Sequence, residues 1–235
     1  MSAQNPSSQL LSHLTTKNLH PTPTWLSTFL STQNPRVPAA SLNRTAIFRL
    51  LASNITQTLQ RTSTTTFPRD IADPNTQTRQ LAGPIVVQIL DIEDVGRSRW
   101  SQIEALEAAE RGETRKGHEI IRTVPGETEA TGLGAGTDAE VAAGSVGGGP
   151  WKLLVQDAAG TRVYAFEMQS VEGIGGETAI GAKMVLRNVM VARGMVMLEA
   201  RGVACLGGKI EEMDKAWREG RKERLKSVVD GEHGV

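Results

Sequence analysis

Cysteine, aromatic side chains and net charge are all scarce in this sequence of 235 residues. The one cysteine, Cys205, excludes an intramolecular disulfide framework and a zinc site made of several cysteines. The 26 Lys and Arg residues balance 26 Asp and Glu residues, which excludes a polycation that binds nucleic acid mainly by neutralising phosphates. No stretch approaches the ~20 continuous apolar residues of a membrane span, and residues 1–14 lack the pattern of a secretory signal. We therefore expect a soluble intracellular protein.

Charge divides the chain into three regions. Residues 1–80 hold seven basic and two acidic side chains and no Glu, residues 81–150 hold six basic and twelve acidic ones, and residues 151–235 hold thirteen basic and twelve acidic ones. These shifts predict three units with separate roles.

The first region has the signals of short helices. Thr22 followed by Pro23 is typical of a helix start, because threonine can cap the helix and proline needs no N–H partner in the first turn. Ser41 is expected to cap a longer helix after the break at residues 35–38. Apolar residues at helical spacing define the faces expected to be buried, and they are Leu10, Leu11, Leu14, Trp25, Leu26, Phe29, Leu30, Ala46, Ile47, Leu50, Leu51, Ile55 and Leu59. We expect a helical bundle over residues 1–62 and a linker over residues 63–80.

From residue 81 the pattern changes to β-strands. Five apolar runs are expected to form strands, and they are residues 85–90, 151–156, 162–168, 182–191 and 194–198. Residues 157–160 have the length of a hairpin turn between the second and third run. The expected fold is mostly β with a helical N-terminus: a five-stranded Greek-key barrel of the oligonucleotide/oligosaccharide-binding (OB) type over residues 81–219. A charged helix closes this domain, and a charged tail is expected over residues 220–235.

A long insertion, residues 97–149, separates the first two expected strands. Residues 98–111 are expected to form a helix with Trp100 and Ile103 on one side, whereas residues 126–149 contain eight glycines. Between these parts lies one apolar island, made of Ile120, Ile121, Val124 and Pro125. A purely solvating linker has no need of such an island, so we interpret the insertion as a functional loop. The alternative for the island is an idle or self-packed loop, and the alternative for Trp100 and Ile103 is packing under the barrel.

Groups suited to catalysis are few. The four histidines lie in expected loops or termini, without a partner at the spacing of a metal site. Cys205 is interpreted as a small buried hydrophobe rather than a nucleophile. Residues 132–137 and 176–183 are rich in glycine but fail the dinucleotide and phosphate-loop patterns. We therefore expect no enzymatic activity, no metal and no cofactor.

Barrels of this type can bind single-stranded nucleic acid when aromatic side chains line a basic groove. Tyr164 and Phe166 share one face of the third expected strand, where alternation favours a place in the core and a stacking platform is the alternative. Arg162, Arg187 and Arg193 could line a groove, although the net charge of residues 151–235 is only +1. The sequence thus allows weak binding of single-stranded or junction DNA and does not support tight autonomous binding.

The order of these features resembles the N-terminal helical and OB-fold region of the RecQ-mediated genome instability protein 1 family. The resemblance extends from about residue 10 to residue 217. It rests on the early helix with Trp25 and Leu26, and on the sequences VQI at 87–89, WSQI at 100–103, PWKLLVQD at 150–157, GAK at 181–183, RGMVML at 193–198 and LGGKI at 206–210.

The resemblance implies a non-catalytic nuclear subunit that binds a type IA topoisomerase III together with a RecQ-type helicase. It also implies a role in double-Holliday-junction dissolution and decatenation, an insertion that reaches the topoisomerase gate, and a short form without a second OB domain. The expected topoisomerase contacts are Trp100, Ile103, Ile120, Ile121, Val124, Pro125 and Lys183, where Lys183 matches the family's partner-facing Gly-x-Lys lysine. A single-stranded-DNA-binding OB protein that acts alone is the alternative, and its DNA binding would be tight and fall steeply with salt.

Overall fold

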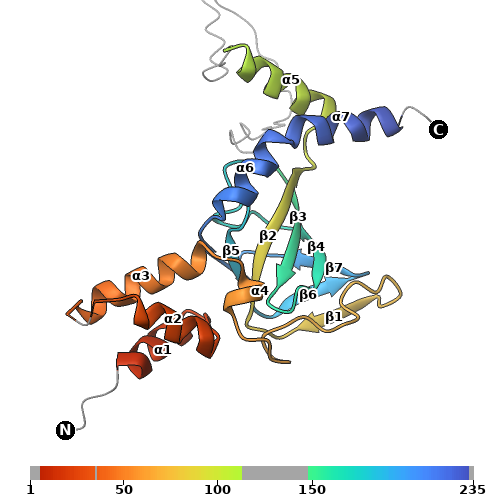
Figure 1. Ribbon diagram of the computed structural model, residues 1–235. Coiled ribbons are helices and arrows are strands. Elements are labelled where there is room, and N and C mark those ends of the chain that lie inside the picture. Colours follow the sequence, from red (N-terminus) through yellow and green to blue (C-terminus); the bar gives the residue numbers. More distant parts are fainter. Residues whose placement is uncertain (1–5, 35, 113–147, 233–235) are drawn as a thin grey trace, which may run out of the picture.

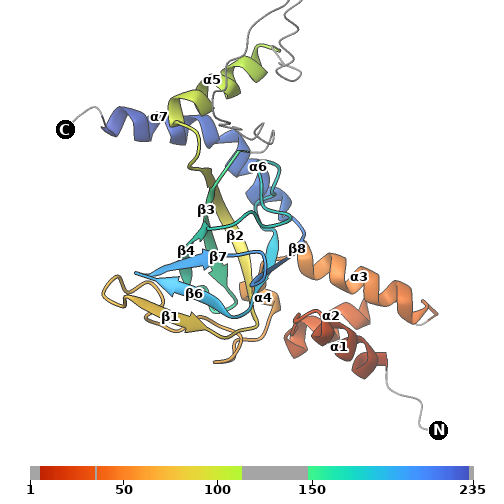
Figure 2. The same cartoon turned by 180° about the vertical axis from the view of Figure 1, so that it is seen from behind.

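The computed structural model describes residues 6–34, 36–112 and 148–232 (Figure 1). A group of N-terminal helices lies against one side of a curled β-sheet, and helices α5 (Arg99–Glu110) and α7 (Arg221–Glu232) lie together at the far end of the sheet (Figures 1 and 2). Within these described ranges, no helix is both long enough and apolar enough to cross a bilayer.

The described part of the N-terminal unit forms helices α1 (Pro6–Thr16), α2 (Pro23–Ser31), α3 (Ala39–Leu51) and α4 (Ile55–Thr58). The expected start of α2 is confirmed, because the Thr22 hydroxyl accepts a hydrogen bond from the Trp25 N–H at 3.2 Å. The expected cap at Ser41 is wrong, since Pro38 is the N-cap of α3 and Ala39 is already helical. The fixed φ of proline lets the helix begin directly after the proline-containing break rather than one turn later.

The helical unit packs its apolar faces against each other and against the sheet. Leu14 and Leu50 are almost fully buried, as the helical spacing predicted. The cluster that contains them also includes Val86, Ala158 and Val185 from the sheet domain. Burial of apolar surface is worth about 25 cal/mol per Å², so this shared cluster holds the helical unit to the sheet.

The described residues form a sheet of eight strands in the order β1-β6-β7-β4-β3-β2-β5-β8. The strands are β1 (Thr78–Leu81), β2 (Ile85–Asp94), β3 (Trp151–Asp157), β4 (Arg162–Glu167), β5 (Lys183–Leu186), β6 (Val189–Ala192), β7 (Met195–Leu198) and β8 (Val203–Gly207). Strands β4 and β7 run parallel, and the other neighbours run antiparallel. The expected turn at residues 157–160 is confirmed, with the Thr161 N–H donating to Asp157 Oδ1 at 2.8 Å.

The connection between β5 and β6 forces the sheet to curl. These two strands lie near opposite ends of the strand order, yet only Arg187 and Asn188 link them. A link of two residues spans at most ~10 Å, so the two ends of the sheet must approach each other. The expectation of five strands is corrected to a curled mixed sheet of eight. The predicted fourth strand is interrupted where Asn188 adopts a φ of 48°, and β1 and β8 were not predicted.

Residues 63–80, for which the composition predicted a linker, pack against the sheet. Phe67 and Ile71 are buried in its core, and the Phe67 N–H donates to Asp157 Oδ2 at 2.7 Å. Residues Thr78–Leu81 then add β1 beside β6. Phe67 and Ile71 thus fix to the sheet a threonine-rich segment whose average composition is that of a loop.

Two helices follow the last strand. Helix α6 (Glu211–Glu219) is the expected charged helix and buries Trp217. Residues 221–232, expected as part of a charged tail, form α7 instead and pack against α5. Lys226 pairs with Glu107 at 2.6 Å, and a second ion pair joins the same two helices. Two of the basic residues that suggested a solvated tail, Lys222 and Lys226, are therefore matched by acidic residues of α5.

Candidate functional site

The two ends of the long insertion are held together by one carboxylate. Strand β2 ends at Asp94, whose side chain is almost fully buried. Its Oδ1 atom accepts hydrogen bonds from the Gly96 N–H at 3.0 Å and from the Gly149 N–H at 2.9 Å. Gln102 of α5 donates to the Asp94 carbonyl oxygen at 2.9 Å, which fixes the start of the insertion from the other side. We call this arrangement the insertion clamp.

Glycine is required on both sides of the insertion clamp. A Cβ atom at Gly96 would lie 2.0 Å from the Gly149 carbonyl oxygen, and a Cβ atom at Gly148 would lie 2.0 Å from Asp94 Oδ2. Real Cβ atoms do not approach other atoms so closely, so a larger residue would push the two chain segments apart. The backbone that enters the insertion and the backbone that leaves it are thus in direct contact.

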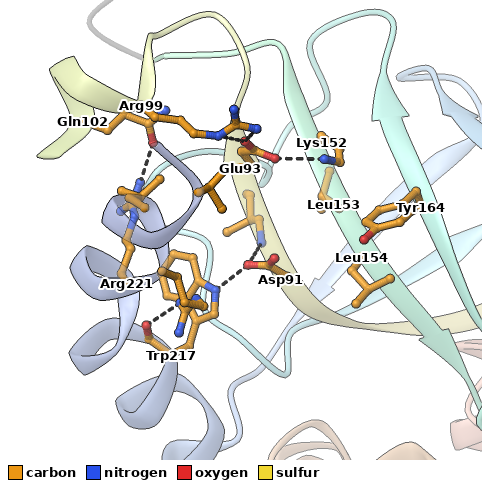
Figure 3. A pocket seen from close by; sticks show the side chains of 14 residues that line it. Asp91, Glu93, Arg99, Gln102, Lys152, Leu153, Leu154, Tyr164, Trp217 and Arg221 are labelled. Carbon is orange, nitrogen blue, oxygen red and sulfur yellow. Dashed lines mark hydrogen bonds and ion pairs between the residues drawn. The ribbon is translucent and has the colours of Figure 1, made fainter. Parts of the chain in front are cut away.

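A groove of about 270 Å³ lies beside the insertion clamp, between the outer face of the sheet and helices α5 and α7 (Figure 3). Glu93 bridges two cations on its floor, because its carboxylate contacts Arg99 at 3.0 Å and Lys152 at 2.9 Å. Burial alone would raise the pKa of Glu93, but the hydrogen bonds and charges of Lys152 and Arg99 outweigh it and hold the pKa below its ordinary value.

Trp217 forms the other wall of the groove. Its indole N–H donates to Asp91 Oδ1 at 2.6 Å, and the guanidinium groups of Arg221 and Arg224 lie 5.1 and 5.5 Å from the ring centroid. Four basic and two acidic side chains line the groove, so it carries a net positive charge. The groove can therefore accept an anionic or acidic ligand, and aromatic rings on its walls can contact apolar groups.

The structure separates the two helix residues predicted to contact a partner. Trp100 is 61% exposed, and its indole N–H donates to Glu104 on the same helix. Ile103 is buried on α5, which packs against α7, so in this structure it stabilises the base of the insertion rather than facing outward. The apolar island of Ile120, Ile121, Val124 and Pro125 lies outside the described residues.

Lys183 does not face outward, contrary to the expectation of a partner-facing lysine. Its side chain has no exposed surface, and Nζ donates to the carbonyl oxygens of Leu51 and Gly181 at 2.6 Å each. Lys183 therefore links the end of α3 to the sheet. Strand β5 is buried on both faces because the helical unit covers its outer side, and this is why the lysine is enclosed.

The predicted preference for a core position is wrong for Tyr164. Tyr164 is 49% exposed and lines the groove, with Lys152 Nζ at 5.1 Å from its ring centroid, while Val163 and Ala165 face the core. Phe166 is half-buried. The small apolar side chains of β4 face the interior, and its aromatic side chains lie on the outer face.

The basic residues predicted to bind nucleic acid are all exposed but are spread over different elements. Arg162 begins β4, Arg187 follows β5 and Arg193 lies in the turn between β6 and β7. None of them is among the residues that line the groove. The cations that do line it, Lys152 and Arg221 among them, were not singled out by sequence reasoning, because their convergence depends on the packing of α7.

Sequence reasoning also missed the insertion clamp. Its signal was present, since Asp94-Val95-Gly96 precedes the insertion and a run of three glycines ends with Gly149. Within the described ranges, no group of three or more His, Cys, Asp or Glu side chains is arranged to hold a metal ion.

These features define a protein with a helical N-terminal domain and an OB-fold domain that carries a long, clamped insertion. Two family models match the chain: "RMI1, N-terminal helical domain" over residues 14–58, and "RMI1, N-terminal OB-fold domain" over residues 67–221. The RecQ-mediated genome instability protein 1 of Schizosaccharomyces pombe is 32% identical over 142 residues, which cover 58% of this chain and 60% of that protein.

Because the OB-fold match extends over more than half of the sequence, the chain belongs to the RecQ-mediated genome instability protein 1 family. The resemblance seen in the sequence is thus confirmed. The match spans about 60% of the length of the fission-yeast relative.

Proposed function

We propose that this chain is a non-catalytic scaffold that binds a type IA topoisomerase III in a RecQ helicase complex and regulates it. It would thereby promote decatenation and double-Holliday-junction dissolution. The family name of the fission-yeast relative, which refers to RecQ-mediated genome instability, supports a role in this pathway. The observation that carries the proposal is the insertion clamp, in which Asp94 holds Gly96 and Gly149 against each other.

The clamp gives the insertion a fixed point of attachment. A segment tethered at both ends to a rigid domain searches a small volume, so its side chains meet a docked partner at high effective concentration. Trp100 stands exposed on α5, next to this attachment point. The apolar island is the part of the insertion that we propose enters the topoisomerase interface.

Deletion of the insertion tests the proposal. Residues 113–147 are replaced by a short Gly-Ser linker, which keeps Gly148 and Gly149 and therefore keeps the clamp. We expect the full chain to stimulate decatenation by its cognate topoisomerase III. Because the deletion also removes the apolar island, we expect it to weaken binding and to abolish stimulation even at protein concentrations at which the weakened complex still forms. Equal stimulation by both proteins would move the function to the barrel and helical unit. No stimulation by either would contradict the proposal.

A matched pair of variants tests the apolar island itself. Replacement of Ile120, Ile121, Val124 and Pro125 by serine should weaken topoisomerase binding at least tenfold without lowering the melting temperature. The control replaces four other apolar residues of the same insertion, Ala139, Val141, Ala142 and Ala143, by serine and should bind normally. Equal affinity of both variants and the unchanged chain would remove the island from the interface.

Single-stranded DNA binding by the groove is a second candidate function, favoured by the outward position of Tyr164. A base stacked on an aromatic ring contributes roughly 1–3 kcal/mol, and Lys152 lies beside this ring. Fluorescence anisotropy with an oligothymidine should then show binding that falls with salt and weakens at least fivefold in Tyr164→Ala. Identical affinity of Tyr164→Ala and the unchanged chain would exclude this face.

A further inference from the structure

The outer face of α3 carries the most exposed large apolar side chain in the described part of the chain. Phe48 is 72% exposed. Residues four apart lie on the same face of a helix, and the other members of this face are exposed as well: Ala40, Arg44 and Ala52. We call these four residues the α3 stripe. Ala52 on one side of Phe48 is small and Arg44 on the other side is exposed, so the Phe48 ring is left uncovered on this face.

Phe48 is not needed to hold α3 in place. The opposite face of the helix buries Ala46 and Leu50 in the helical core, and α1 packs against α3 there. Burial of an aromatic side chain releases free energy in proportion to the apolar area removed from water. In the isolated chain this free energy is unused, so it is available to a surface that covers the ring.

The charge of the helical unit selects the kind of surface that fits. Residues 1–69 contain six Lys and Arg residues and no Asp or Glu. Arg44 stands one turn from Phe48 in the α3 stripe, and Arg49 lies over the ring of Phe29 at 5.5 Å and donates to Thr32. A ligand of the α3 stripe therefore meets positive charge and no carboxylate from residues 1–69, which favours an acidic partner.

Two other occupants fit less well. A second copy of this chain would bring Arg44 against the same basic unit, with no acidic side chain in residues 1–69 of either copy to offset it. Nucleic acid is usually held by several phosphate contacts and a groove with aromatic platforms. The α3 stripe offers one cation and one ring on a convex helix.

We propose that the α3 stripe binds an acidic segment of a partner protein. Phe48 enters an apolar pocket of that partner, and Arg44 pairs with a carboxylate at the rim of the pocket. An aromatic anchor flanked by arginine is a common centre of binding energy in protein interfaces. Helix α3 lies away from α5 (Figure 1), so its exposed face is a second contact region, separate from the one proposed above.

Photo-crosslinking identifies the segment. The full chain with p-benzoyl-phenylalanine at position 48 is assembled with its cognate topoisomerase III and RecQ-type helicase, partners whose choice rests on the proposed function. We expect a crosslink to a peptide with an excess of Asp and Glu. The same crosslinker at Met168, an exposed apolar position of the sheet domain, should not label that peptide.

Binding of the crosslinked peptide then tests the side chains. By fluorescence anisotropy with the full chain, Phe48→Ala and Arg44→Glu should each weaken binding at least tenfold, whereas Met168→Ala should bind as before. Because Phe48 is exposed, Phe48→Ala should keep the melting temperature. The chain without residues 113–147 should bind the peptide normally, so a failure of the insertion proposal is seen separately. No crosslink, or a crosslink to DNA, to a second copy or to a non-acidic peptide, would overturn the proposal, as would unchanged affinity of Phe48→Ala.

Discussion

Replacement of Lys183 by methionine should change how the stability of this protein depends on pH. Lys183 has no exposed surface, and its Nζ atom donates to the Leu51 and Gly181 carbonyl oxygens at 2.6 Å each. A neutral amine has two N–H groups, which match these two acceptors, whereas an ammonium group has a third N–H to satisfy. The geometry therefore suits the neutral amine.

The direction of the effect follows from the pKa of Lys183, which burial lowers from 10.5 to about 7. Below pH 7 both the folded and the unfolded chain hold the proton, and the folded chain bears the full cost of a buried ammonium. Between about pH 7 and pH 10 the folded chain loses the proton while the unfolded chain keeps it, so the free energy of unfolding rises with pH. Each tenfold change in a protonation equilibrium corresponds to about 1.4 kcal/mol, so the rise can reach at most about 5 kcal/mol.

Urea denaturation followed by circular dichroism between pH 6 and pH 9.5 measures this rise. Burial and the charge of Glu172 raise the pKa of Cys205, which opposes the effect above about pH 9, so both proteins carry Cys205→Ala. In Lys183→Met the two carbonyls lose their donor at every pH. We expect the unfolding free energy of the Lys183 protein, minus that of Lys183→Met, to increase by several kcal/mol across this range. A difference that stays constant with pH would refute a lowered pKa.

Three further predictions concern stability. Gly181→Ala should cost more than ~2 kcal/mol, because its φ is +86° and the new Cβ would lie 2.6 Å from a backbone nitrogen at the start of α6. Gly207→Ala, with a φ of +73° and open space, should cost only the ~1 kcal/mol of backbone strain, and urea denaturation compares the two. Asp94→Ala should lower the free energy of unfolding by ~2–4 kcal/mol. It should also speed hydrogen exchange of the Gly96 and Gly149 N–H groups, which donate to the Asp94 carboxylate. Trp217→Phe should lower the free energy of unfolding by ~2 kcal/mol, because the hydrogen bond to Asp91 is lost. In a double-mutant cycle, the same substitution should cost less when Asp91 has already been replaced by Asn.

Features that depend on neighbours in sequence were predicted well. The helix over residues 98–111 was expected from the spacing of its apolar side chains, and it forms as α5, capped by the Ser98 hydroxyl, which accepts from the Ser101 N–H at 3.1 Å. The hairpin turn at residues 157–160 and the burial of Leu10 and Leu14 in α1 were expected for the same reason, whereas Leu11, expected on the same face, is exposed. Each of these depends on a cap, a turn or a period of 3.6 residues, which a short stretch of sequence contains in full.

Features that depend on distant partners were not predicted. The strand expected over residues 162–168 carries apolar side chains on both of its faces. The alternation alone therefore could not show that Tyr164 lies outside and Ala165 inside. The burial of Lys183 depends on the carbonyl of Leu51, 132 residues away. Strand β1 exists because it pairs with β6, and its own residues, TRQL, have little strand character.

The position of Lys183 predicts how its substitution would affect partner binding. An exposed lysine that contacts an acidic partner contributes to association through its charge, so its loss lowers the association rate and flattens the dependence of that rate on salt. Lys183 is enclosed between α3 and the sheet, and in this structure it cannot contact a partner directly. We therefore expect Lys183→Met to reduce the affinity of any partner that contacts both the helical unit and the barrel, while the salt dependence of association stays unchanged.

Arg44→Glu, in contrast, should alter the salt dependence, because Arg44 is exposed on the α3 stripe. Surface plasmon resonance with the proposed partners, a topoisomerase III and a RecQ-type helicase, at 50, 150 and 300 mM salt separates the two effects. A loss of salt dependence in Lys183→Met would mean that this lysine reaches a partner surface after a rearrangement of the helical unit.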